Sequence, residues 1–410
     1  MESLPRELRA ELSTMTPLLG NPSTMVRPRM SGKATVGVRR ESQQTAVTGW
    51  SRTSCGAARL LICGMFLSRA TASLAGQTPK TSAGPARRSV LVYTGGPGRP
   101  GYSIDDFVHT VSFVDTAGRA NAWLCDGAIF LEYHAPSGRY MMPWTEGYLP
   151  STGDDWVTYL DSVFAVTGPV ARLDSAVGTV TSTVGGIASP FSLTVMIPYP
   201  DPRSDTLRFG GRLYHFRVDR DRATAVDSYV SEVKSRIGGL HLRYLTFTGM
   251  YWLREGIPST DSALVTLVSA SLHRQSLQFV WIPAWGAAGA EKWRLFGFDQ
   301  AAQQANYFFH WDVPVTRLDS ALASARAAQM GLEIEFDRRM FGPNWEYWDR
   351  LEPYLSAVAS APDFRAKPIV IYDGAGALMQ LARSRDAWER ALYERLAAVL
   401  RAPATSSPAR

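Results

Sequence analysis

Cysteine and histidine are scarce in this chain. Its 410 residues include three cysteines and six histidines, and neither type is clustered at the spacing of a zinc site. Cys55 and Cys63 fall in a leader-like segment, so Cys125 is left alone without a partner for an internal disulfide. We therefore expect no disulfide framework and no metal site, and we expect Cys125 to pack as a small hydrophobic residue.

The motifs of several large enzyme classes are also missing. The chain has no Walker loop and no G-x-S-x-G nucleophile elbow. Glycines at 96, 98 and 101 have the spacing G-x-G-x-x-G, but prolines at 97 and 100 interrupt it, which argues against a dinucleotide fingerprint. The turn Gly95-Gly96-Pro97-Gly98 follows a strand-like segment, but it lacks the Lys-Ser/Thr pair that a phosphate-binding loop needs. These absences argue against nucleotide chemistry, and we expect no cofactor.

The positive charge is confined to the start of the chain. Residues 1–88 contain 13 Lys/Arg and 4 Asp/Glu, whereas the remainder contains 30 Lys/Arg and 33 Asp/Glu. The part that can fold is therefore close to neutral and gives no reason to expect a nucleic-acid partner. Its apolar runs are too short to span a bilayer, so we expect no integral membrane segment in the mature chain. The sequence does not indicate an oligomeric state.

The leader divides into three parts. Residues 1–56 are rich in Ser, Thr, Arg and Gly, which predicts a disordered or mis-assigned extension. Residues 57–76 join Arg59 and a short apolar run to small residues with a cleavage point after Ala75, which is typical of a signal peptide. Residues 77–88 then form a linker. This reading predicts a secreted, periplasmic or cell-surface protein; the alternative is a stray apolar patch in a disordered tail.

From residue 89 the chain alternates short β-rich segments with longer helical ones. We predict strands at residues 89–95, 126–134, 192–200, 245–252, 277–285, 295–299, 331–337 and 367–373. Helices are expected near 103–114, 154–180, 222–237, 260–275, 317–330, 344–360 and 384–401. Eight strands alternating with helices predict a (β/α)8 barrel of the TIM type over residues 89–402, with a flexible tail at 403–410. A doubly wound open sheet is the alternative, but polar residues follow many strands here instead of gathering at one switch point.

The segment 331–337, GLEIEFD, carries acids at every second position. With a period of two, Leu332 and Ile334 share one face of the strand, while Glu333 and Glu335 share the other. Buried strands rarely carry carboxylates unless these are paired or functional. The pattern favours a strand whose acidic face meets a cleft at the mouth of the barrel.

Further acids and aromatic residues follow the other predicted strands. Carboxylates bind sugar hydroxyls and aromatic rings stack on sugar faces, so this set suits a carbohydrate. We predict Glu255 as the acid/base and Glu335 as the nucleophile or base of a glycosidase, because strands four and seven lie nearly opposite in the ring. Glu333, one layer lower, is either structural or a substrate contact. The other predicted substrate-binding residues are Glu132, Tyr199, Trp252, Trp281, Trp285, Asp299, Asn306 and Tyr307, with the three tryptophans as stacking platforms.

Several motifs occur together in a fixed order. They are DGAIFLE (126–132), IPYP (197–200), GMYWLRE (249–255), FVWIP (279–283), GFD (297–299) with QANY (304–307), and GLEIEF (331–336). This set resembles the bacterial domain of unknown function family 4855 over about residues 89–360, with Ala305 where that family has proline. The placement of acids after strands four and seven is also similar to clan A glycoside hydrolases, although Arg254 stands where those enzymes have asparagine.

The sequence thus predicts an exported glycoside hydrolase that acts on a polysaccharide or glycan. A carbohydrate-binding barrel without turnover fits the aromatic residues equally well. A metal-dependent enzyme that uses Glu132, Glu333, Glu335 and Asp299 as oxygen ligands is a third hypothesis, without support from histidines.

Overall fold

The computed structural model describes residues 86–401 except 145, 188 and 344. The predicted extension, the signal-peptide-like segment, most of the linker and the tail therefore lie outside the described residues. Within the described part, no helix is both long and apolar enough to cross a membrane.

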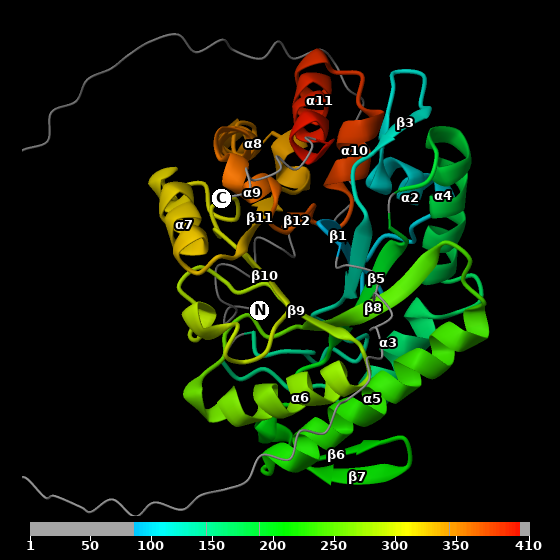
Figure 1. Cartoon of the computed structure of the whole chain (residues 1–410), viewed down its shortest axis with the longest axis vertical. Coiled ribbons are helices and arrows are strands. Elements are labelled where there is room, and N and C mark those ends of the chain that lie inside the picture. Colours follow the sequence, from blue (N-terminus) through cyan, green and yellow to red (C-terminus); the bar gives the residue numbers. More distant parts are fainter. Residues whose placement is uncertain (1–85, 145, 188, 344, 402–410) are drawn as a thin grey trace, which may run out of the picture. The chain divides into compact units, whose positions relative to one another are not determined.

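Eight parallel strands close into a barrel, with helices packed around it (Figure 1). Around the ring the strands follow the order β1-β12-β11-β10-β9-β8-β5-β4, and β4 pairs with β1 to close it. The barrel strands are β1 (Arg88–Tyr93), β4 (Gly127–Leu131), β5 (Phe191–Ile197), β8 (Leu245–Trp252), β9 (Gln278–Trp281), β10 (Gln300–Gln303), β11 (Gly331–Glu335) and β12 (Ile369–Tyr372). The predicted (β/α)8 fold is confirmed, and the open sheet is excluded.

Helices follow seven of the eight barrel strands, and β9 is followed only by a 3-10 turn at Ala290–Lys292. The helices are α2 (Ile104–Val111), α3 (Gly153–Val163), α4 (Pro169–Val184), α5 (Asp219–Leu240), α6 (Ser262–Arg274), α7 (Thr316–Ala327), α8 (Leu351–Ser360), α9 (Pro362–Arg365), α10 (Ala377–Arg383) and α11 (Ala387–Arg401). The structure also contains two antiparallel hairpins outside the barrel sheet, which were not predicted. They are β2 (Ser112–Val114) with β3 (Ala120–Trp123) and β6 (Thr206–Phe209) with β7 (Arg212–His215).

The single helix predicted at 154–180 is two helices. Thr152 caps α3 and forms a reciprocal capping box with Asp155. The helix ends at Val163, and Pro169 starts α4 at a position where its missing N–H costs nothing. The turn between them therefore breaks one apolar pattern into two packed helices.

The sixth strand was predicted at the wrong residues. The apolar run 295–299 forms a loop, and the strand is the following Gln300–Gln303. Phe298 stacks on the rings of Phe279 and Trp281, while Leu295 is largely exposed. Packing against neighbouring strands thus outweighs the strand preference of the aromatic segment.

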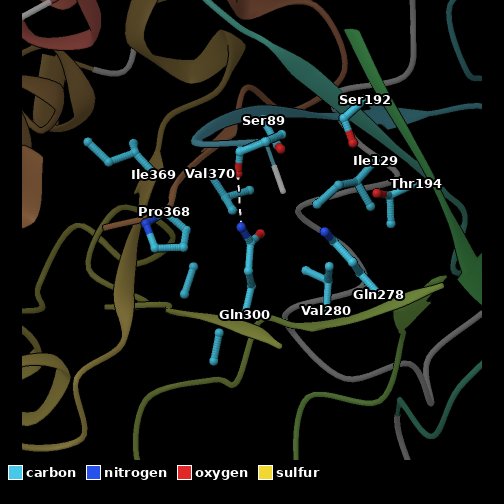
Figure 2. A pocket seen from close by; sticks show the side chains of 13 residues that line it. Ser89, Ile129, Ser192, Thr194, Gln278, Val280, Gln300, Pro368, Ile369 and Val370 are labelled. Atoms are coloured by element: carbon cyan, nitrogen blue, oxygen red, sulfur yellow. Dashed lines mark hydrogen bonds between the residues drawn. The ribbon is translucent and has the colours of Figure 1, made fainter. Parts of the chain in front are cut away.

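The amino end of the barrel interior is lined by a mixture of polar and aliphatic side chains (Figure 2). Ser89, Ser192, Thr194 and Gln278 line it, and the Gln300 amide donates a hydrogen bond to the Ala86 carbonyl at 3.1 Å. The remaining cavity is about 10 Å³, which is room for one water molecule at most. This end of the barrel is a filled core, so a ligand site has to be sought at the carboxyl ends of the strands.

Gly331, the first residue of β11, lies close against the chain that enters β12. A Cβ atom added at Gly331 would lie 1.9 Å from the carbonyl oxygen of Pro368, which belongs to the chain entering β12. We predict that Gly331→Ala lowers the free energy of unfolding by about 2 kcal/mol or more, through the backbone shift it forces. In contrast, Gly238→Ala on α5 meets no atom within 4 Å and should be neutral or stabilising by up to about 1 kcal/mol. Urea unfolding of both variants measures the difference, and equal stabilities would contradict the tight closure.

Candidate active site at the barrel mouth

Three carboxyl groups lie at the carboxyl ends of β8 and β11. Glu333 and Glu335 are the third and last residues of β11 and, as the period of two predicts, lie on the same face of that strand. Glu255 is the third residue after β8. The negative charges of Glu335 and Glu255 both raise the pKa of Glu333, after the larger effect of burial. The structure therefore brings the three acids into one electrostatic cluster, which we call the carboxyl cluster.

Glu335 is fully buried and held by hydrogen bonds. Its Oε1 accepts from the backbone N–H of Asn306 at 2.9 Å, and its Oε2 accepts from that of Tyr307 at 3.1 Å and from the phenol of Tyr354. Asn306 has a left-handed backbone, with φ of 49°, which turns these N–H groups toward β11. Burial raises the pKa of Glu335 to about 7 although the hydrogen bonds oppose the shift. This carboxyl fastens the loop after β10 to the end of β11.

Glu333 has the opposite environment. Its side chain is 2 % exposed, and within the described part of the chain no hydrogen bond or ion pair reaches its oxygens, which are not among the fully enclosed polar atoms. The phenol rings of Tyr93, Tyr251 and Tyr372 are close enough for the charge of Glu333 to raise their pKa values, after the larger effect of burial. Burial raises the pKa of Glu333 itself well above its usual range. A buried acid without a partner is uncommon and has to be explained by a ligand or a proton.

Glu255 is half-buried and has two polar neighbours. The phenol of Tyr133 donates to its Oε1 at 3.4 Å. Burial raises the pKa of Glu255, while hydrogen bonds from the Gln304 amide and from Tyr133 oppose the shift. Arg254, the preceding residue, points elsewhere: its guanidinium pairs with Asp261 at 2.6 Å and bonds the Tyr199 hydroxyl at 2.5 Å. Glu255 thus keeps the raised pKa that a general acid requires.

Five aromatic rings form a continuous series beside these acids. Trp144 packs on Tyr133 at 5.3 Å between centroids, Tyr133 on Tyr93 at 5.4 Å, Tyr93 on Tyr372 at 5.6 Å, and Tyr372 on Phe309 at 5.2 Å. They come from β1, β12 and the loops after β4 and β10. Trp144, 42 % exposed, is the most accessible of them. We call this series the aromatic row.

The aromatic row was missed by the sequence analysis, apart from Tyr93 as a strand end. Tyr133 follows the predicted Glu132 directly and could have been included for that reason. Trp144 and Phe309 lie in irregular loops without any periodic pattern. Only the folded barrel brings these rings together.

Two predicted platforms are wrong. Trp252 and Trp281 are 1 % and 0 % exposed, so neither ring can offer a face to a sugar. Trp281 stacks on Phe298 and donates its indole N–H to the Arg254 carbonyl at 2.9 Å. Both rings pack in the core instead. Trp285 is half-buried, and its backbone N–H donates to the side chain of Asn306 at 2.7 Å.

Asp299 lies at the wrong end of the barrel for the predicted role. It precedes β10, where its carboxylate accepts from the backbone N–H of Phe279 at 2.7 Å and contacts His273 at 2.9 Å. The error follows from the misplaced sixth strand. Because Asp299 is remote from β11's carboxyl end, the four-oxygen metal set of Glu132, Glu333, Glu335 and Asp299 is not assembled. Nowhere in the described ranges do three or more His, Cys, Asp or Glu side chains converge as metal ligands would.

Glu132 and Tyr199 lie at strand ends as predicted, but both are engaged by arginines. Glu132 accepts two hydrogen bonds from Arg99, at 2.7 and 2.8 Å. Tyr199 donates to Asp261 at 2.7 Å and accepts from Arg222 and Arg254. Asp373, after β12, turns to the backbone at the start of α10. These contacts brace the loops around the carboxyl cluster.

The fold and the site together define a (β/α)8 barrel with a carboxyl cluster and an aromatic row at its mouth. In a comparison with protein families, residues 88–398 match the domain of unknown function DUF4855. The chain belongs to this family. No curated protein matches it in sequence.

Solved barrels are similar only at a distance. A mutant tryptophan synthase α-subunit from Pyrococcus furiosus is 9 % identical, with a TM-score of 0.34 over 77 % of this chain and 97 % of that one. The pneumococcal virulence factor StrH is 10 % identical, with a TM-score of 0.34 over 76 % and 81 %. A cycloisomaltooligosaccharide glucanotransferase from Paenibacillus sp. is 11 % identical, with a TM-score of 0.30 over 60 % and 37 %. Similarities of this size transfer no chemistry to the chain.

The unpartnered state of Glu333 predicts a stability effect that depends on pH. A carboxyl whose pKa is raised by folding costs stability as the pH rises above its unfolded pKa, about 4.3 for glutamate. Glu333→Gln removes this titration, so we expect the variant to exceed the wild type by about 1–3 kcal/mol at pH 8 and by much less at pH 5. Thermal unfolding at both pH values measures this. Glu394→Gln, on the exposed side of α11, is the matched control, and an equal gain in both variants would contradict the assignment.

Proposed function

We propose that this barrel is a glycoside hydrolase that binds its glycan along the aromatic row and cleaves it at the carboxyl cluster. The observation that carries the proposal is the pair formed by Glu255 and Glu333. Both are acids with raised pKa values at the mouth of the barrel, and they come from strands four and seven of the ring. Glycoside hydrolysis needs one protonated and one ionised carboxyl beside the same bond.

In this proposal Glu255 is the general acid. It is half-buried, so it can meet a ligand, and burial raises its pKa, which favours the protonated form that a general acid needs. It protonates the glycosidic oxygen as the bond to the anomeric carbon breaks. The hydrogen bond from Tyr133 connects this acid to the aromatic row, whose exposed ring, Trp144, stacks on the apolar face of a sugar.

Glu333 is the second carboxyl of the proposed reaction. The sequence pattern favoured Glu335 for this role, but the lone pairs of Glu335 are already used by two backbone N–H groups and the Tyr354 phenol. The oxygens of Glu333 have no such partners and are therefore free to act on the anomeric carbon, either directly or through a water molecule. Glu335 then acts as a positioning residue that fixes the end of β11.

Substitution of the two acids tests this assignment. We expect Glu255→Gln and Glu333→Gln each to lower hydrolysis by about 10²–10⁴-fold, because each removes one half of the acid–base pair. The wild type is first assayed for release of reducing sugars from chitin, chitosan, xylan, cellulose, starch and peptidoglycan. The matched control Glu394→Gln should keep full activity. Full activity of Glu333→Gln together with inactivity of Glu335→Gln would return the second role to Glu335.

The hydrogen bond between Tyr133 and Glu255 predicts a shift of the pH profile. This bond favours the ionised form of Glu255, so its loss in Tyr133→Phe raises the pKa of the acid further. Since Glu255 must be protonated, the alkaline limb of kcat/KM should move to higher pH, while the retained ring preserves the aromatic row. A limb that stays in place or moves to lower pH would contradict Glu255 as the acid.

A binding barrel without turnover is the second candidate, since the aromatic row would serve it equally well. Glycan binding by the wild type, unchanged by Glu255→Gln and without release of sugar, would support that function.

A further inference from the structure

The carboxyl cluster has no cation of its own. Across residues 86–401, leaving aside the three positions the structure does not describe, no Lys or Arg forms an ion pair with Glu255, Glu333 or Glu335. Three arginines in the loops after β1, β8 and β11 are matched elsewhere. Arg99 pairs with Glu132 at 2.7 Å and Arg339 with Asp337 at 2.7 Å, while Arg254 pairs with Asp261. When these acids ionise, their negative charge is therefore not neutralised by an ion pair with Lys or Arg in the described part of the chain.

Three phenol groups from β1, β8 and β12 lie within electrostatic reach of Glu333, the member of the cluster without a hydrogen bond. Tyr93 and Tyr251 are fully buried and Tyr372 is half-buried, and all three sense the charge of Glu333. The electron-rich faces of tyrosines attract cations, and a carboxylate among such rings strengthens that attraction. Arg99 already uses one side of Tyr93 in this way, at 4.9 Å from the ring centroid. The surroundings of Glu333 thus suit a small cationic group.

The geometry favours an ammonium group over a metal ion. A divalent metal needs several oxygen ligands converging at 2.0–2.6 Å, and the described acids form no such group. An ammonium needs only one or two carboxylate acceptors and an aromatic wall. A neutral sugar would supply hydroxyl donors to Glu333, but it would leave the negative charge uncompensated in a buried place.

We propose that the glycan carries a free primary amine at the reacting unit, as in oligomers of 2-amino-2-deoxyhexoses. This inference rests on the proposed function and names its substrate class. The 2-ammonium lies next to the anomeric carbon, so one oxygen of Glu333 accepts from it while the other faces that carbon. The positive charge favours the ionised form of Glu333, and binding therefore releases a proton. The same cluster repels uronic acids and sulfated sugars.

Calorimetry on the full chain with Glu255→Gln, which removes the proposed general acid, tests the inference without turnover, and cleavage is measured separately on the wild type. The probes are tetramers of glucosamine and of galactosamine, each with its N-acetylated counterpart, at about pH 6, where the amines are protonated. We expect at least one amino tetramer to bind about tenfold tighter or more than its acetylated form, with proton release visible as a dependence on buffer ionisation heat. Glu333→Gln should abolish both the preference and the proton release, and Glu394→Gln should retain them.

The outcomes separate this inference from the proposed hydrolysis. An acetylated tetramer that binds as tightly as its amino form overturns the inference, as does a preference that survives in Glu333→Gln or the absence of binding by both amino tetramers. If a neutral polysaccharide is then cleaved with dependence on Glu333, the hydrolase proposal still stands. If an amino tetramer binds through Glu333 but mass spectrometry finds no cleavage, the inference holds and the hydrolase proposal fails.

Discussion

Ionisation of Glu333 places a negative charge on a side chain that is 2 % exposed, next to two further carboxyls and within electrostatic reach of three phenol groups. Nothing in the described part of the chain donates a hydrogen bond to it, so no partner within the protein offsets the desolvation of the ionised form. The barrel holds Glu333 at this position in spite of that cost. β11 lies between β10 and β12 in the closed ring, and the strand that carries the acid cannot move away from the cluster without breaking two ladders of backbone hydrogen bonds.

Glu333 and Glu335 have identical side chains, but their neighbours give them different hydrogen-bonding environments. They are two residues apart on one face of one strand, and both are buried. The loop after β10 reaches only Glu335, because the left-handed turn at Asn306 aims successive N–H groups at it. Tyr354 from α8 completes that set. Glu333 accepts no hydrogen bond in the described part of the chain, whereas Glu335 is engaged in holding the loop.

The sequence was sufficient for the architecture and for the acids of β11, because both depend on local periodicity. Alternating strands and helices predict the barrel, and the period of two places Glu333 and Glu335 together. The errors arose where tertiary packing decides. Phe298 looked like part of a strand but stacks on Trp281, which displaced the sixth strand and put Asp299 at the wrong end. Trp252 and Trp281 were indistinguishable from surface platforms in the sequence, whereas Trp144, in an irregular loop, had no pattern that would mark it.

The pKa of Glu255 depends on the direction in which the neighbouring Arg254 side chain points. Arg254 precedes it in the chain, and a guanidinium turned toward Glu255 would stabilise the carboxylate and lower its pKa. Asp261, just before α6, prevents this because its carboxylate pairs with Arg254. Arg254 also donates to the Tyr199 hydroxyl, and Asp261 pairs with Arg222 as well. The charged groups of this network pair with one another, so the network acts on the site only by holding Arg254 in place. It keeps Arg254 away from the acid, so this guanidinium does not neutralise the carboxyl cluster.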